Sequence, residues 1–103
     1  MSRLKLVADP KFRAKVAIPL AGGDPVEVEF VFKHRTRTAL KEFIESRAGV
    51  SDIDTLFEIA CGWELEDEFS KENLNTLLEN YAGSALAIYQ TYRDELVKSR
   101  PKT

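Results

Sequence analysis

Cysteine and histidine are almost absent from this chain of 103 residues, which contains one of each. A single cysteine excludes a disulfide framework within the chain, and one cysteine with one histidine cannot supply the four ligands of a structural zinc site. Cys61 lies in an apolar stretch that we interpret as helical, so we expect a small buried side chain there. Its neighbours Glu58 and Glu64 are acidic, whereas a reactive thiolate needs an electropositive setting. The sequence therefore predicts no metal site and no cofactor.

Long apolar segments and a large excess of one charge are also missing. No apolar run approaches the roughly 18–20 residues that cross a bilayer, and charged residues interrupt the start of the chain too often for a secretory signal. The 15 basic and 17 acidic side chains nearly cancel, whereas general nucleic-acid binding requires a basic face. We therefore expect a cytoplasmic protein with neither a membrane nor a nucleic acid as its partner.

Groups of catalytic residues are not recognisable in the sequence. His34, the only candidate for a histidine general base, lies between two basic residues and has no accompanying nucleophile motif. Gly22 and Gly23 are not part of a phosphate-binding motif, and the acidic stretch 64–68 lacks the spacing of a calcium loop. We therefore predict that the protein is not an enzyme and has no catalytic residues.

The composition that is present belongs to a compact domain, with 44% hydrophobic and 31% charged residues. A chain of this length buries enough apolar surface to fold without disulfides or metal, so we expect one domain over residues 1–103. Apolar and polar residues alternate over 12–18 and again over 26–32, and this period of two predicts half-buried strands. The glycines and prolines of 19–25 favour an antiparallel hairpin with a loose loop.

Helical spacing of apolar residues follows the hairpin. Serine and threonine residues precede the periodic segments as candidate N-caps, and glycines follow the first two of them. Four helices are expected, which begin at Thr36 or Thr38, at Ser51, at Ser70 and after a bend at 82–84, and which end near Gly49, Gly62, Tyr81 and Ser99.

The first ten residues are weakly patterned. Leu4, Leu6 and Ala8 alternate with other residues, which suits an edge strand and a frayed arm equally well. A two-stranded hairpin needs a layer that covers its apolar face, and the helices supply one. The predicted fold class is therefore α+β, with an N-terminal antiparallel β-hairpin packed on a small bundle of about four helices.

Charge is distributed unevenly along the chain. Residues 1–50 contain 10 basic and 6 acidic side chains, whereas residues 51–103 contain 5 basic and 11 acidic ones. Complementary regions on one molecule can join copies head to tail, so we predict weak, salt-sensitive self-association. The basic residues of this contact are Lys33, Arg35 and Arg37, and the acidic ones are Glu64, Glu66, Asp67 and Glu68.

Trp63 stands beside the acidic stretch, directly after the expected end of the second helix. A large aromatic residue at such a position is either a lid on the core or an anchor for a partner, because tryptophan is enriched among the residues that dominate interface energies. Leu65 and Phe69 bracket the same stretch, and we expect at least one of the three to be exposed and to bind a partner. The alternative is that all three belong to the core.

Three segments in a fixed order carry a resemblance to a known family. They are Pro10-Lys11-Phe12 with Val16-Ala17-Ile18-Pro19; Phe30-Val31-Phe32-Lys33-His34-Arg35-Thr36-Arg37 with Leu40 and Phe43; and Gly62-Trp63 with Asp67-Glu68-Phe69-Ser70, Asn73-Leu74, Leu77-Leu78, Tyr81, Ala85, Ala87-Ile88 and Tyr92. Over nearly the whole chain, this set resembles the tail assembly chaperones of long-tailed bacteriophages and prophages.

The resemblance implies a small, non-enzymatic α+β protein of the host cytoplasm that is absent from the mature virion. Such a chaperone coats the long tape measure protein, keeps it soluble and yields its place as the tail tube polymerises. Members are often made in two lengths by ribosomal frameshifting, and the longer form recruits tail tube protein. The resemblance makes this chain the shorter form.

The alternative is a small phage-encoded acidic regulatory protein that inhibits a host protein. Such an inhibitor would use the acidic loop to mimic nucleic acid, and it requires acidic residues over a whole face. The first half of this chain is basic, which disfavours that reading.

Overall fold

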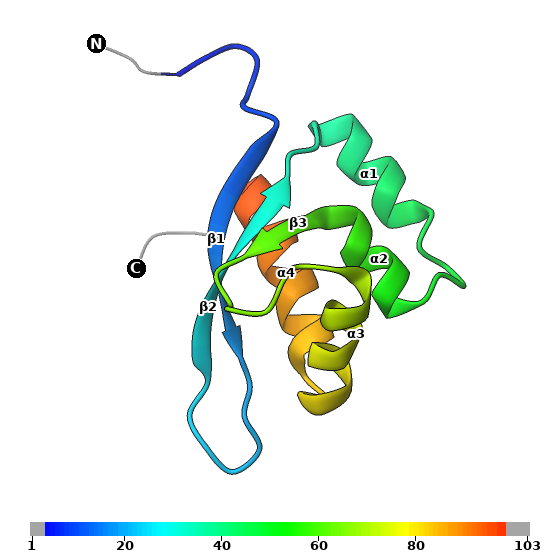
Figure 1. The fold of residues 1–103 in the computed structure, drawn as a ribbon. Coiled ribbons are helices and arrows are strands. Elements are labelled where there is room, and N and C mark those ends of the chain that lie inside the picture. The colour runs from blue at the N-terminus through cyan, green and yellow to red at the C-terminus, as the bar shows by residue number, and fades with distance from the viewer. Residues whose placement is uncertain (1–3, 99–103) are drawn as a thin grey trace.

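The computed structural model describes residues 4–98 and shows a three-stranded sheet packed against helices (Figure 1). The described residues confirm the α+β class, with an N-terminal antiparallel hairpin and four helices. The strands are β1 (Lys11–Ile18), β2 (Val26–Lys33) and β3 (Ala60–Trp63), in the sheet order β1-β2-β3. The helices are α1 (Arg37–Glu45), α2 (Asp52–Ile59), α3 (Lys71–Asn80) and α4 (Ser84–Val97).

β1 and β2 form the predicted hairpin. Their register pairs Ala14 with Phe30 and Val16 with Val28, and all four side chains are buried on one face of the sheet. The connecting loop turns at Gly22, whose φ of 75° lies in a region that glycine adopts without steric cost. The period of two in the sequence therefore predicts both strands and their buried face.

The prediction that the second helix continues to Gly62 is wrong. α2 ends at Ile59, and the next four residues form β3, which lies antiparallel to β2 with Trp63 opposite Phe30. A short apolar run fits a helix or a buried strand equally well by its periodicity. Here the backbone of β2 offers partners on its second edge, and these would be lost if the helix continued. Cys61 is consequently half-buried in a strand rather than buried in a helix.

The predicted helix starts are confirmed. The side chains of Thr36, Ser51 and Ser70 each accept a hydrogen bond from the backbone N–H three residues later, at 3.1, 3.3 and 3.0 Å. The first helix ends earlier than expected, at Glu45 rather than near Gly49.

The remaining ends of the helices differ only slightly from the expectation. α3 ends at Asn80, so Tyr81 is its C-cap rather than part of the helix. α4 ends at Val97, and the expected end near Ser99 lies outside the described residues. Residues 4–10 contain no strand, so the edge strand that the sequence allowed there is not formed.

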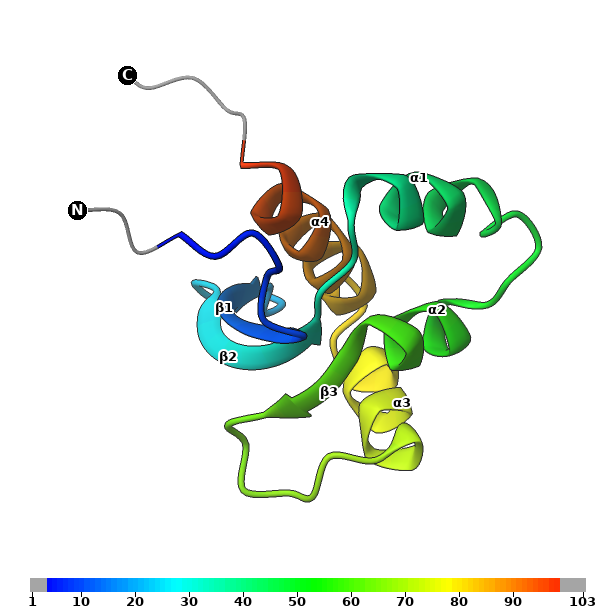
Figure 2. The ribbon, with the colours of Figure 1, turned by 90° about the horizontal axis from the view of Figure 1, so that it is seen from above.

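The core lies between the hairpin and the helices. α4 packs along β1, and α2 contacts both α3 and α4, which places the helices on the apolar side of the sheet (Figure 2). The aromatic rings of Phe12, Phe32 and Tyr92 join the hairpin to α4, with centroids 5.4–6.0 Å apart. The buried apolar residues are Ala14, Val16, Ile18, Val28, Phe30, Phe32, Leu40, Phe43, Leu56, Ile59, Ala60, Leu74, Ile88 and Tyr92.

Candidate partner-binding groove

Trp63, at the end of β3, holds the following loop against the sheet. Its ring meets Phe30 edge-on at a centroid distance of 5.9 Å and Phe69 edge-on at 5.1 Å. Its indole Nε1 donates a hydrogen bond to the Asp67 carbonyl oxygen at 2.7 Å. A tryptophan that is half-buried with its polar atom paired is well ordered while one side remains available for contact.

The three residues predicted to bind a partner have different surroundings. Trp63, Leu65 and Phe69 are all half-buried and pack against the core. Phe69 stacks on Phe57 of α2 with centroids 5.9 Å apart, behind the Trp63 ring. Trp63 and Leu65, in contrast, line a groove, so the structure brings only these two to the same concave surface.

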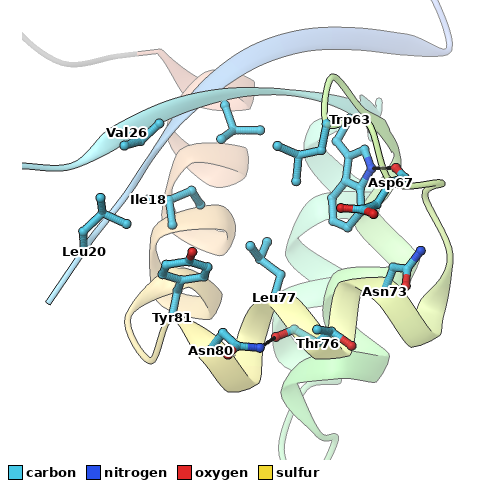
Figure 3. Close-up of a pocket in the computed structure, with 12 residues that line it drawn as sticks. Ile18, Leu20, Val26, Trp63, Asp67, Asn73, Thr76, Leu77, Asn80 and Tyr81 are labelled. Atoms are coloured by element: carbon cyan, nitrogen blue, oxygen red, sulfur yellow. Dashed lines mark hydrogen bonds between the residues drawn. The ribbon is translucent and has the colours of Figure 1, made fainter.

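This groove lies between the loop end of the hairpin and α3, and it has a volume of about 530 Å³ (Figure 3). Apolar side chains from the hairpin form one wall, and α3 with its C-cap forms the other. Two of the apolar residues, Val26 and Tyr81, are 49% and 39% exposed. The groove is lined by Ile18, Leu20, Val26, Val28, Trp63, Leu65, Asp67, Asn73, Thr76, Leu77, Asn80 and Tyr81.

The polar residues of the α3 wall are already paired within the chain. Asn73 Nδ2 donates to the Glu68 carbonyl at 2.7 Å, and Asn80 Nδ2 donates to the Thr76 carbonyl at 2.9 Å. Thr76 Oγ1 donates to the Glu72 carbonyl at 3.1 Å. Because these polar groups are paired, a ligand would bind mainly through the apolar surface of the groove. The polar border would fix the orientation of that ligand.

The acidic residues around the groove divide into two groups. The Glu64 carboxylate accepts a hydrogen bond from the Glu29 backbone N–H at 2.8 Å, so this side chain extends the β2 ladder beyond β3. Glu66, Asp67 and Glu68 are exposed in the loop, and Asp67 also lines the groove. The groove therefore has a negatively charged border at its Trp63 end.

The basic residues predicted for self-association lie elsewhere, at the end of β2 and the start of α1. Arg35 is half-buried: its Nη1 donates to the Tyr92 hydroxyl at 2.9 Å, and its guanidinium lies 4.1 Å from the centre of the Phe43 ring. Tyr92 in turn donates to the Lys33 carbonyl at 2.8 Å. Burial raises the pKa of Tyr92, and the hydrogen bond from Arg35 partly opposes this rise. Lys33 and Arg37 have exposed side chains.

Comparison with known proteins identifies the family. A family model described as phage tail assembly chaperone matches residues 1–103, which is the whole chain. This chain belongs to the phage tail assembly chaperone family. No curated protein and no solved structure gives a significant match to it.

Metal clusters and membrane-spanning helices are both missing from the described part of this tail assembly chaperone. Within residues 4–98 no group of three or more histidine, cysteine, aspartate or glutamate side chains could hold a metal ion. In the same residues no helix is long and apolar enough to span a membrane. The groove gives the chaperone a concave surface that is lined mainly by apolar side chains.

Sequence reasoning finds only part of this groove in the chaperone. Trp63 and Leu65 are predicted because they adjoin the acidic stretch, but the hairpin and α3 residues are not. Leu20 and Val26 carried a signal, since they are apolar residues next to the prolines of a loop. Their proximity to Tyr81 follows from the tertiary fold and not from spacing in the sequence.

Proposed function

We propose that this chaperone binds the tape measure protein in the groove and keeps it soluble until the tail tube assembles. Membership of the tail assembly chaperone family supports the process, and the apolar groove with its polar border supports the kind of ligand. A helical segment with an apolar stripe is the ligand that such a groove accepts. The protein acts as a non-catalytic assembly factor in the host cytoplasm and is absent from the virion.

The anchors of this interface are apolar side chains at both ends of the groove. Trp63 lies at one end, and Val26 and Tyr81 lie at the other (Figure 3). Leu65, two residues after Trp63, also lines the groove. Phe69 supports Trp63 from behind, so its contribution to binding is indirect. The exposed carboxylates beside the groove keep the free protein soluble while the apolar surface is uncovered.

The proposal also covers the release of the tape measure protein from the groove and the recruitment of tail tube protein. A groove that buries part of a helix gives a contact that tail tube protein can displace as the tube grows. The tube subunits are recruited by a longer, frameshifted form of the chain.

Charge adds a contact between copies. Lys33 and Arg37 meet Glu66, Asp67 and Glu68 of a neighbouring copy, and all five side chains are exposed. Arg35 and Glu64 already have hydrogen-bond partners within their own chain. Their charges therefore add to the charge of each surface without forming a direct pair across the contact.

The observation that carries the proposal is the pair of exposed apolar residues in the groove, Val26 and Tyr81. The double variant Val26→Ser/Tyr81→Ser removes apolar surface without opening the core, so we expect a folded protein. Co-expression with a tape measure fragment then yields about tenfold less soluble complex than the parent chain, because interface anchors carry most of the binding energy. Leu86→Ser is the matched control, since Leu86 is 62% exposed and does not line the groove. Equal losses in both variants, or no loss in either, would exclude the groove as the binding site.

A further inference from the structure

An apolar arm precedes the sheet. Residues 4–10 have no helix or strand, yet Leu6 and Val7 in this arm are almost completely exposed, Val7 by 82%. Leu6, Val7 and Ala8 form a short apolar run between the charged residues Lys5 and Asp9. These three residues are exposed and belong to no helix or strand within residues 4–98.

A strand position is also open beside the groove, along the edge of β2. The backbone N–H and C=O of Glu29 both point to the β3 side, because they bond the carboxylate and the N–H of Glu64. Backbone groups alternate along a strand with a period of two, so those of Glu27 point to the same side. β3 pairs with β2 only from Phe30 onward, so within the described residues no strand covers Glu27 on this side.

The arm of the same chain cannot fill this position. β1 runs from Lys11 to Ile18 and therefore spans about 24 Å. Val26, at the exposed end of the groove, pairs with Ile18, the last residue of β1, next to the hairpin loop and at the end of β1 opposite to the arm (Figure 1). Leu6 lies only four residues before Pro10, a reach of about 14 Å when fully extended. The occupant must therefore come from another molecule.

We propose that the arm of one copy adds to the β2 edge of a second copy and places its apolar side chains in the groove of that copy. Backbone hydrogen bonds to Glu27 fix the arm, as in other cases of strand addition, and Leu6 contacts the apolar surface of Val26 and Tyr81.

Two consequences follow from this arrangement. The arm and the groove are different surfaces of one chain, so the contact is head to tail and joins copies in an open series. The arm also covers the apolar groove when no other ligand is bound. A tape measure segment would then compete with the arm for the same groove. This competition rests on the proposed function.

Self-association tests the arm directly. In sedimentation velocity at about 1 M salt, where the charge contact is screened, the parent chain and the control Leu86→Ser are expected to associate as concentration rises. Leu6→Ser/Val7→Ser is expected to remain monomeric under the same conditions. The substituted arm residues are exposed, so folding is preserved and is checked by circular dichroism. Association of the arm variant to the same extent as the parent would overturn the inference.

A labelled peptide of residues 1–10 tests the groove. Fluorescence anisotropy is expected to show saturable binding to the Leu6→Ser/Val7→Ser chain, whose groove is free. Adding Val26→Ser/Tyr81→Ser to that chain weakens peptide binding by about tenfold, and adding Leu86→Ser leaves it unchanged. No binding, or equal binding to all three chains, would overturn the inference.

A competition experiment separates this inference from the proposed function. A tape measure fragment is expected to displace the bound peptide. If the peptide binds the groove but the fragment does not displace it, the arm contact stands and the proposed tape measure site fails. If the fragment binds and is weakened by Val26→Ser/Tyr81→Ser while the peptide does not bind, the proposed function stands and the arm contact fails.

Discussion

Phe43 of α1 lies between two arginine guanidinium groups. Arg35 lies 4.1 Å and Arg47 lies 4.0 Å from the centre of its ring. Both arginines also contact α2: Arg35 Nη1 lies 3.5 Å from the Glu58 carbonyl, and Arg47 Nη1 lies 3.2 Å from the Glu58 carboxylate. This arrangement joins α1 to α2 beside the buried Leu40 of the same helix, because each charged group has both a ring and a hydrogen-bond acceptor.

The Tyr92 hydroxyl is the residue-scale test of this network. Tyr92→Phe removes the bonds that join Arg35 and the Lys33 carbonyl to α4, and we expect a loss of about 1–2 kcal/mol in the free energy of unfolding. Tyr89→Phe is the control on the same helix, because Tyr89 is half-buried and contributes its ring beneath Arg93. Urea denaturation of both variants provides the measurement. A Tyr92→Phe protein as stable as Tyr89→Phe would show that the hydroxyl contributes nothing.

At the scale of elements, an ion pair connects two helix N-termini. Lys71 at the start of α3 lies 2.6 Å from the Asp54 carboxylate in the first turn of α2. The hydrogen bond from Lys71, with a smaller contribution from Ser51, holds the pKa of Asp54 below its ordinary value. Both side chains of the ion pair are about half exposed, so solvent screens it and its effect on stability is small.

This ion pair predicts a pH dependence. A carboxyl group whose pKa is lowered in the folded state stabilises the protein above its unfolded pKa of about 3.9, and this contribution is lost as the pH falls through the lower folded value. Asp54→Asn cannot titrate, so its stability falls less steeply below pH 4 than that of the parent. Urea denaturation between neutral pH and about pH 2.5 compares the two chains. Identical slopes in this range would contradict the assignment.

At the scale of the whole molecule, the proposed charge contact and the proposed arm contact use different surfaces. The exposed residues Glu66, Asp67 and Glu68 lie in the loop between β3 and α3, whereas Lys33 and Arg37 lie at the end of β2 and the start of α1. The arm lies at the end of the hairpin opposite to its loop (Figure 1), whereas the groove is lined by Leu20 and Val26 next to that loop. Salt screens the charge contact but not the burial of apolar surface. The effect of ionic strength on self-association therefore distinguishes the charge contact from the arm contact.

The charge contact predicts salt-sensitive self-association. Because the Debye length falls from about 10 Å at 0.1 M to 3 Å at 1 M salt, added salt weakens the charge-driven part of the association of the parent chain. Glu66→Gln/Glu68→Gln reduces that salt dependence, since it removes two exposed charges from the loop. Glu79→Gln/Asp94→Asn removes the same charge from α3 and α4 and serves as the control. Equal salt dependence in the two double variants, measured by sedimentation, would contradict a specific role for the loop.

The local sequence determined the strands of the hairpin and the starts of three helices. Alternation over β1 and β2 specifies which side chains face the core, because a shift of one residue would move every apolar side chain to water. Thr36, Ser51 and Ser70 specify helix starts, because each cap satisfies a backbone N–H of its own helix. Both signals act within a few residues, so they can be recognised without the fold.

The candidate site could be predicted only in part. Trp63 and Leu65 were found, because a large aromatic residue beside an acidic stretch is a local signal. Arg35 was expected to act as a surface charge, whereas the fold supplies Tyr92 and Phe43 as its partners. Contacts between residues that lie far apart in the sequence produce no periodic pattern, so a single sequence does not reveal them.

Only the tertiary structure decided β3 and the groove. The four residues of β3 are too short to show a period, and their conformation depends on the free edge of β2. The groove is formed by the loop end of the hairpin, the residues after β3 and the C-terminal part of α3, which meet only when the helices pack on the sheet. Local hydrogen bonds and side-chain periodicity are encoded over a few residues, whereas a concave surface depends on how distant elements pack.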